Sequence, residues 1–128
     1  MTPAHPTEPS RPAVAVAAAL VVAQFVVLYL PDPSAVPGVD LPVPHLDKIV
    51  HVGAFALPTW ALVRLVRRRH LVVVAMLAQA VVSEVVQGAL LPNRGFEWLD
   101  LAADVAGVGL GLALAAWTPT RGPRPAEL

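Results

Sequence analysis

The sequence has no cysteine and few charged residues, and both features exclude certain kinds of site and of protein. Without a thiol, the chain forms no disulfide, no thiolate metal site and no cysteine nucleophile, although a membrane bundle needs no disulfide in any compartment. Charged residues make up 14% of the chain, against about a quarter in typical soluble domains. The GxSxG, HExxH and phosphate-loop patterns are missing as well, so the standard hydrolase and phosphate-binding signatures give no guide to function.

Apolar residues dominate what is present. They form 56% of the chain, and the mean hydropathy is +0.65, which is too apolar for a soluble domain. A chain of 128 residues accommodates about four spans of roughly 20 residues with short connections, leaving no room for a globular domain outside the membrane. The sequence therefore predicts an all-α integral membrane bundle of four transmembrane helices with short loops.

Four apolar runs mark the expected spans, which cover approximately residues 13–30, 48–66, 71–91 and 99–117. They form one transmembrane domain over 13–118. The proline-rich segment 1–12 is predicted to be a disordered cytoplasmic tail, 119–128 a second cytoplasmic tail, and 31–46 an extended loop. For the first run a cleaved signal peptide is the alternative, which a mature protein beginning near residue 37 would establish.

Two features predict helix shape and packing. Pro58 lies inside the second run and is expected to kink that helix. Gly107 and Gly111 form a small-xxx-small spacing in the fourth run, which favours close helix approach. Their GVGLG segment follows no strand, so a dinucleotide-binding loop is excluded by its context.

The positively charged residues predict the orientation. With the amino terminus inside, seven of the nine Lys and Arg residues are cytoplasmic, and only Lys48 and Arg94 lie outside. Most acids have the opposite distribution, so the acidic end of the bundle is expected to face outward. The short RRRH run at residues 67–70 is a topology signal in this scheme, and nucleic acid is not an expected partner.

Ionisable side chains gather beside the turn between the third and fourth runs. Glu84 and Gln87 share one helix face, and Asp100 and Asp104 share another, at spacings that suit a helix. The start of the second run adds further polar side chains at the same end. The predicted polar pocket, here called the polar layer, consists of Asp47, Lys48, His51, Glu84, Gln87, Arg94, Glu97, Asp100 and Asp104.

The charges of the polar layer do not balance. Five acids face Lys48 and Arg94, with His51 able to supply one more positive charge. Either some carboxyls stay protonated, or a cation or cationic ligand completes the balance. The alternative is that these groups only lock helix packing, since interhelical hydrogen bonds contribute about 0.6 kcal/mol each on average.

No cofactor and no metal site is predicted. The ligand types alone would suit a divalent cation, but nothing in the spacing selects one. The residues that this option would use are His51, Glu84, Asp100 and Asp104.

Three segments together resemble a known family. DKIVH at 47–51, the pair Glu84 and Gln87, and RGFEWLDLAADVAGVGLG at 94–111 resemble, in order and spacing, the signature segments of VanZ-like membrane proteins. The resemblance implies a small multi-helix protein of the bacterial cytoplasmic membrane, in a family named for a member linked to teicoplanin resistance. Where the family pattern has Asn, this chain has Asp104. The family's characteristic polar residues fall on Asp47, Lys48, His51, Glu84, Gln87, Arg94, Glu97 and Asp100.

The leading functional hypothesis is that the outward polar layer binds or senses an envelope component without covalent chemistry, with an effect on glycopeptide susceptibility. Membrane lipids are expected partners, together with a lipid-linked envelope precursor, a glycopeptide or a cationic amphiphile. The alternative is a membrane-embedded hydrolase or transferase acting on a lipid-linked substrate. In it Glu84 is the general acid or base, His51 shuttles protons, and Lys48 and Arg94 hold a phosphate. The sequence fixes neither the ligand nor the oligomeric state.

Overall fold

The computed structural model describes residues 8–30, 45–92 and 94–118, and within these ranges it contains four α-helices and no strand. This confirms the all-α fold class. Each helix end lies within two residues of the predicted span. The predicted loop and carboxy-terminal tail lie almost wholly outside the described residues, as does most of the amino-terminal tail. The helices are α1 (Arg11–Tyr29), α2 (Leu46–Leu65), α3 (Arg69–Leu90) and α4 (Trp98–Trp117).

Each helix is long and apolar enough to cross a membrane. The lengths of 19 to 22 residues correspond to about 28–33 Å at 1.5 Å per residue, which matches a hydrocarbon core of about 30 Å. Large apolar side chains such as Val22, Val74 and Leu110 point away from the bundle and are exposed. A soluble protein would bury such side chains, whereas lipid tails solvate them. The protein is therefore a multi-pass membrane protein.

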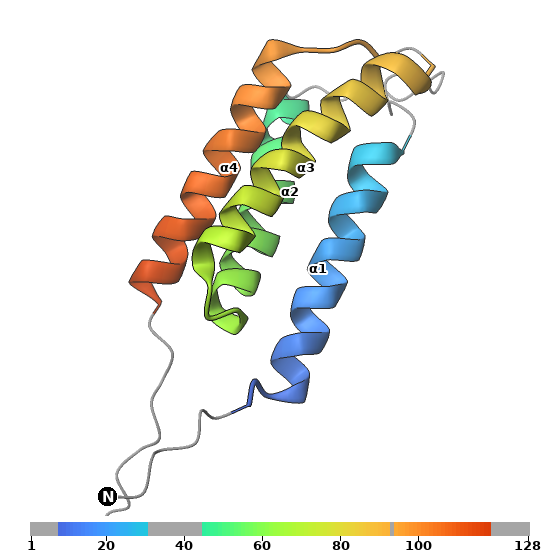
Figure 1. Ribbon diagram of the computed structural model, residues 1–128. Coiled ribbons are helices and arrows are strands. Elements are labelled where there is room, and N and C mark those ends of the chain that lie inside the picture. Colours follow the sequence, from blue (N-terminus) through green and yellow to red (C-terminus); the bar gives the residue numbers. More distant parts are fainter. Residues whose placement is uncertain (1–7, 31–44, 93, 119–128) are drawn as a thin grey trace, which may run out of the picture.

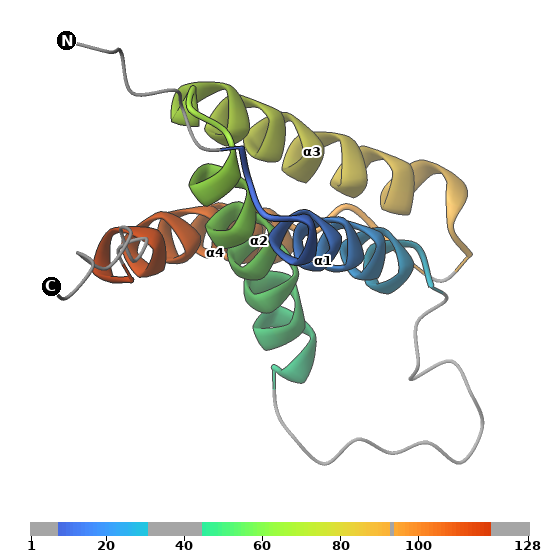
Figure 2. The ribbon, with the colours of Figure 1, turned by 90° about the horizontal axis from the view of Figure 1, so that it is seen from below.

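The helices run alternately up and down, so four helix ends meet at each end of the bundle (Figure 1). One end, here called the polar end, gathers the last turns of α1 and α3 and the first turns of α2 and α4, at the top of Figure 1. The opposite end, here called the basic end, gathers the start of α1, the last turn of α2, the start of α3 and the end of α4. Seen from below, α3 lies along one side of the bundle, and α2 crosses the direction in which α1 and α4 run (Figure 2).

The contact between α2 and α4 is the most extensive in the bundle. A Cβ atom at Gly107 would lie 2.5 Å from the carbonyl oxygen of Val52, and one at Gly111 would lie 2.5 Å from that of Ala56. No side chain larger than hydrogen fits at either position, so the two backbones touch. The predicted close approach is thus confirmed, and its partner is α2.

A small apolar core fills the space between the helices. Phe55 is fully buried and packs with Val63, Val72, Met76 and other apolar residues from all four helices. The helix α2 remains continuous through the buried Pro58, which lacks an amide hydrogen and so leaves one carbonyl of the preceding turn without its usual donor. The predicted kink at this residue stays a prediction.

Candidate functional site

Lys48 lies among three carboxylates at the outermost part of the polar end. Its Nζ donates to Asp47 Oδ2 at 2.6 Å and to Glu97 Oε2 at 2.7 Å, and it also forms an ion pair with Asp100 Oδ1. The side chains of Asp47 and Glu97 are 58% and 57% exposed, whereas that of Lys48 is 18% exposed. We call Asp47, Lys48 and Glu97 the rim. One ammonium group is thus paired with three carboxylates, and two of these carboxylates are exposed at the outside of the bundle.

His51 and Asp104 form a buried contact one helical turn deeper. Nδ1 of His51, on α2, lies 2.8 Å from Oδ1 of Asp104, on α4. Because a carboxylate accepts, the imidazole donates its Nδ1 hydrogen to Asp104, and its Nε2 faces Asp100, whose Oδ2 is 3.9 Å away. The close approach at Gly107, one turn along α4, brings the two backbones near enough for this bond. The sequence places His51 and Asp104 in one layer, and the structure pairs them.

Glu84 on α3 completes the deeper part of the site and is 0% exposed. Its Oε2 accepts the backbone N–H of Glu97 at 3.2 Å, so the segment that enters α4 is tied to α3. Its other oxygen, Oε1, has no hydrogen-bond partner among the described residues, and the same is true of Oδ2 of Asp104. We call His51, Glu84 and Asp104 the floor. Asp100 connects the floor to the rim.

The floor and Asp100 bring ligand atoms from three helices together. His51, Glu84 and Asp100 each place one such atom within 4.8 Å of the others. A second group, Asp47, Glu97 and Asp100, meets the same condition, but Lys48 contacts all three of its members. The polar layer therefore has an outer part that is neutralised in part by an ammonium group and an inner part in which carboxylates and imidazole face one another.

Gln87 and Arg94, which the sequence assigned to the same pocket, are directed elsewhere. Gln87 Nε2 donates to the carbonyl oxygen of Leu28 at 2.8 Å, and Arg94 Nη1 donates to the same oxygen at 3.4 Å. Leu28 lies in the last turn of α1, where backbone carbonyls have no partner within the helix. These two residues therefore attach the end of α1 to α3 and to the turn that follows it. Lys48 and Arg94 do not present their charges to a common point.

Three further buried polar residues lie outside the predicted polar layer. Gln24, Thr59 and Ser83 are all buried, and Ser83 Oγ donates to the backbone of its own helix. Nε2 of Gln24 and Oγ1 of Thr59 have no hydrogen-bond partner in the described part of the chain. A lone polar residue in an apolar span is a signal of an inward position, and this signal was available for Gln24.

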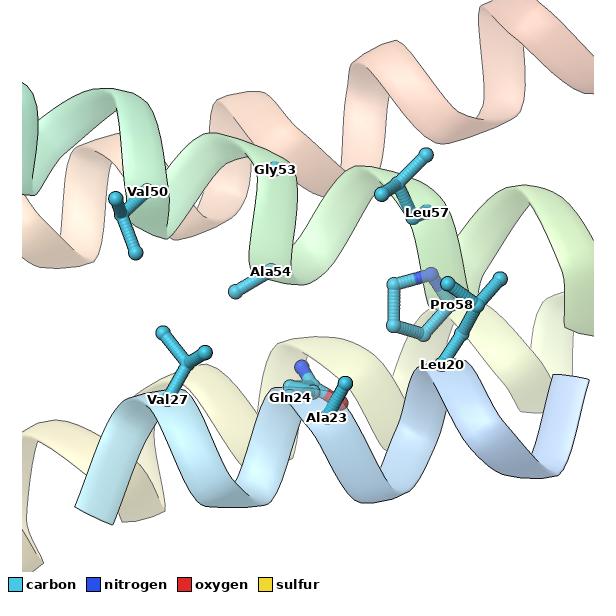
Figure 3. Close-up of a pocket in the computed structure, with 9 residues that line it drawn as sticks. All are labelled: Leu20, Ala23, Gln24, Val27, Val50, Gly53, Ala54, Leu57 and Pro58. Atoms are coloured by element: carbon cyan, nitrogen blue, oxygen red, sulfur yellow. The ribbon is translucent and has the colours of Figure 1, made fainter. Parts of the chain in front are cut away.

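Gln24 belongs to a cleft between α1 and α2 (Figure 3). The cleft has a volume of about 160 Å³ and an almost entirely apolar lining, and it is partly open to the outside. The name α1–α2 cleft is used for it below. Its lining residues are Leu20, Ala23, Gln24, Val27, Val50, Gly53, Ala54, Leu57 and Pro58.

Arg64 connects α2 to the end of α4 at the basic end. Its guanidinium lies 5.2 Å from the centre of the Trp60 ring, and it donates to Oγ1 of Thr118 at 2.6 Å and to the carbonyl oxygen of the same residue. Trp60 Nε1 also donates to Thr118 Oγ1, at 2.9 Å. The bonds to Thr118 join α2 to the end of α4, the stacking on Trp60 lies within α2, and none of these contacts involves a carboxylate.

Comparison of the chain with protein-family models, with curated proteins and with solved structures finds no match. The similarity to VanZ-like proteins therefore stays a prediction from the sequence motifs. The fold and the polar layer define the class of protein: a small multi-pass membrane protein with a cluster of carboxylates at one end of a four-helix bundle.

Proposed function

We propose that this is a VanZ-like protein of the bacterial cytoplasmic membrane that binds the cationic headgroup of an amphiphilic envelope component at its rim. In this proposal both termini are cytoplasmic and the polar end faces outward, as the distribution of Lys and Arg predicts. The observation that carries the proposal is that one ammonium group, Lys48, is shared by three carboxylates.

The charge balance supports a cationic ligand. Five carboxylates of the polar layer face two permanent cations, Lys48 and Arg94, and Arg94 donates to a backbone carbonyl of α1. Three negative charges therefore remain without a fixed positive partner. Since Asp47 and Glu97 are more than half exposed, a headgroup reaches them without unfolding any part of the bundle.

The α1–α2 cleft offers a place for the chain of such an amphiphile. It includes Val50, which lies three residues after the rim residue Asp47 on α2, so the cleft begins about one helical turn from the headgroup site. Lipid tails are as apolar as this lining, so a chain gains little free energy by moving from the bilayer into the cleft. The headgroup is therefore what selects the ligand, and the cleft orients it.

Two alternatives explain less of the geometry. A helix lock accounts for the His51 and Asp104 pair and for the contact of Gln87 with α1, but it requires neither an exposed excess of acid nor an unpaired Glu84 oxygen. A hydrolase acting on a lipid-linked phosphate needs its cations to converge on the substrate. Here Lys48 is held by carboxylates and Arg94 by α1, which favours the binding function.

Binding measurements in nanodiscs of zwitterionic lipid test the proposal. Three amphiphiles with the same alkyl chain and a trimethylammonium, phosphocholine or sulfate headgroup are titrated against the full chain. We expect saturable binding of the cationic amphiphile only, weakened by added salt because the rim is exposed. Equal affinity for all three headgroups would refute a cation-selective rim.

A matched pair of variants locates the binding. Glu97→Gln removes one rim charge, keeps the backbone N–H that Glu84 accepts, and is expected to weaken cationic binding at least about threefold, consistent with about 1 kcal/mol for an exposed pair. Glu8→Gln removes an exposed acid that precedes the start of α1, the helix whose last turn is at the polar end, and should leave the affinity unchanged. Equal losses in both variants would show that binding follows net charge rather than the rim. A lipid-linked precursor and a glycopeptide are the next probes, because only their binding would connect this site to antibiotic susceptibility.

A further inference from the structure

Three side chains converge in the inner part of the polar layer. Each has one supporting contact and one further atom that can ligate a metal ion. His51 is held through Nδ1 by Asp104, which leaves Nε2. Asp100 is held through Oδ1 by Lys48, which leaves Oδ2 facing that imidazole. Glu84 is held through Oε2 by the backbone N–H of Glu97, which leaves Oε1. This arrangement is the one by which proteins orient metal ligands, with an outer group fixing each ligand from behind.

The free oxygen of Glu84 points to a missing partner. The side chain is 0% exposed, and Oε1 has no hydrogen-bond donor among the described residues. The carboxylate is enclosed by helices, and buried carboxylates are normally paired or bound to a metal. Asp104 Oδ2, also 0% exposed, is in the same condition. A cation among these oxygens satisfies them, and no described protein group does.

We propose that His51, Glu84 and Asp100 bind one divalent transition-metal ion between α2, α3 and α4, with Asp104 and Lys48 as positioning residues. The donor set, one imidazole nitrogen and two carboxylate oxygens, suits Zn²⁺ and Mn²⁺. Ca²⁺ and Mg²⁺ prefer all-oxygen sites with six or more ligands, and three protein ligands including a histidine do not provide these. Three protein ligands leave at least one position on the ion open to water or a ligand group.

The distances fit such an ion after small side-chain movements. Two ligand atoms at about 2.1 Å from one ion are about 3.4 Å apart in a tetrahedral site and at most about 4.2 Å apart in any site. The observed separation of 3.9 Å between His51 Nε2 and Asp100 Oδ2 lies in this interval. One ligand atom of each of the three residues lies within 4.8 Å of the others, so a small movement of the Glu84 side chain brings one of its oxygens into range.

The ion also changes the charge of the polar layer. A divalent cation reduces the three uncompensated negative charges to one, which a monovalent headgroup at the rim then neutralises. The metal site and the rim meet at the contact of Asp100 with Lys48 and at the backbone N–H of Glu97, which Glu84 accepts. The inference therefore goes beyond the proposed headgroup binding and stands without it.

Metal titration of the full-length chain tests the inference. Protein in detergent is treated with a chelator, exchanged into metal-free buffer and titrated with ZnCl₂, MnCl₂, CaCl₂ or MgCl₂, and bound metal is counted by mass spectrometry. We expect one Zn²⁺ or Mn²⁺ per chain and no saturable uptake of Ca²⁺ or Mg²⁺. Absence of stoichiometric transition-metal binding would overturn the proposal.

Three variants separate the floor from the rim. Glu84→Gln removes a ligand with almost no change of shape and is expected to weaken Zn²⁺ binding more than 100-fold. Asp104→Asn, which removes only the charge behind His51, should weaken it by about 10–100-fold, as outer groups do in known sites. Asp47→Asn changes a rim acid that contacts Lys48 and should leave the affinity within about threefold. If Asp47→Asn abolishes binding and Glu84→Gln does not, the metal lies among the exposed acids and the floor site is wrong.

Spectroscopy of the wild-type protein keeps the test independent of variants that fail to fold. Mn²⁺ bound at the proposed site is coordinated by one imidazole, so its electron spin echo is expected to show modulation from one directly bound nitrogen. A carboxylate-only environment would overturn the assignment to His51. The metal and headgroup proposals fail separately, because Glu97→Gln tests the rim and Glu84→Gln the floor.

Discussion

The two ends of the bundle hold their charges in different ways. At the basic end, Arg64 stacks on Trp60 and donates to Thr118, and no described carboxylate lies within ion-pair distance of it. At the polar end, five carboxylates crowd around one ammonium and one imidazole, and two of their buried oxygens have no described partner. The hydrogen-bond donors and acceptors at the basic end are those that helix packing requires, whereas the polar end has more hydrogen-bond acceptors than donors to pair with them. A surplus of buried acceptors is what distinguishes a binding site from a helix lock.

Among the variants considered, the loss in the free energy of unfolding should be largest when the imidazole of His51 is removed from the polar end. His51→Leu leaves Asp104 buried without a donor, and we expect the free energy of unfolding to fall by about 3 kcal/mol, the lower end of the cost of breaking a buried pair. Thermal unfolding in detergent, followed by circular dichroism, measures this loss.

The double variant His51→Leu with Asp104→Leu is the control for that loss. Replacing both members of a buried pair by apolar residues is often neutral or stabilising. We therefore expect the double variant to recover at least half of the stability lost in the single one. A double variant as unstable as the sum of two damaged sites would mean that packing volume, not charge, explains the result.

A smaller effect of opposite sign is expected at Glu84. In metal-free protein, Glu84→Gln removes a buried charge beside other acids and gives the unpaired position a donor, so the thermal midpoint should stay unchanged or rise, by up to about 1 kcal/mol in the free energy of unfolding. Added ZnCl₂ should then stabilise the wild type, because an ion that binds only the folded state favours it, and should not stabilise the variant. A clear fall of the midpoint in metal-free Glu84→Gln would instead place this residue among the groups that hold the bundle together.

The smallest effect is expected at the basic end. Arg64→Met keeps the length of the side chain but loses the stacking on Trp60 and the contacts with Thr118. An exposed cation–π contact contributes about 0.5–1 kcal/mol, so we expect a loss of this size in the same thermal assay and no change in metal or headgroup binding. A loss as large as that of His51→Leu would abolish the contrast between the two ends.

The helices and the members of the polar layer follow from local patterns in the sequence. Apolar runs of suitable length, interrupted by proline-rich or basic segments, define the spans to within two residues. The polar layer could be expected because a short turn forces the end of α3 and the start of α4 to the same side. Gly107 and Gly111 likewise predict a close contact from spacing alone, although not which helix they contact.

Contacts that depend on the rotation and neighbours of each helix could not be predicted in this way. Gln87 and Arg94 reach the end of α1, and nothing in the sequence says that α1 ends beside them. The sharing of Lys48 by three acids and the convergence of His51, Glu84 and Asp100 require three helices to be placed at once. Helix rotation is set by packing of the whole bundle, which leaves no signature in the spacing of residues along one helix.

The backbone contact at Gly107 and Gly111 has a mechanical consequence. Where main chain touches main chain, at these two glycines, no compressible side-chain layer separates the helices, so we expect α2 and α4 to move as one half. His51, Asp100 and Asp104 all belong to that half, while Glu84 belongs to α3, which contacts the pair less extensively. Capture of a ligand between the halves therefore pulls on α3 alone. Because α3 runs the length of the bundle, we expect a displacement of α3 at the polar end to move the arginines at its start, at the basic end.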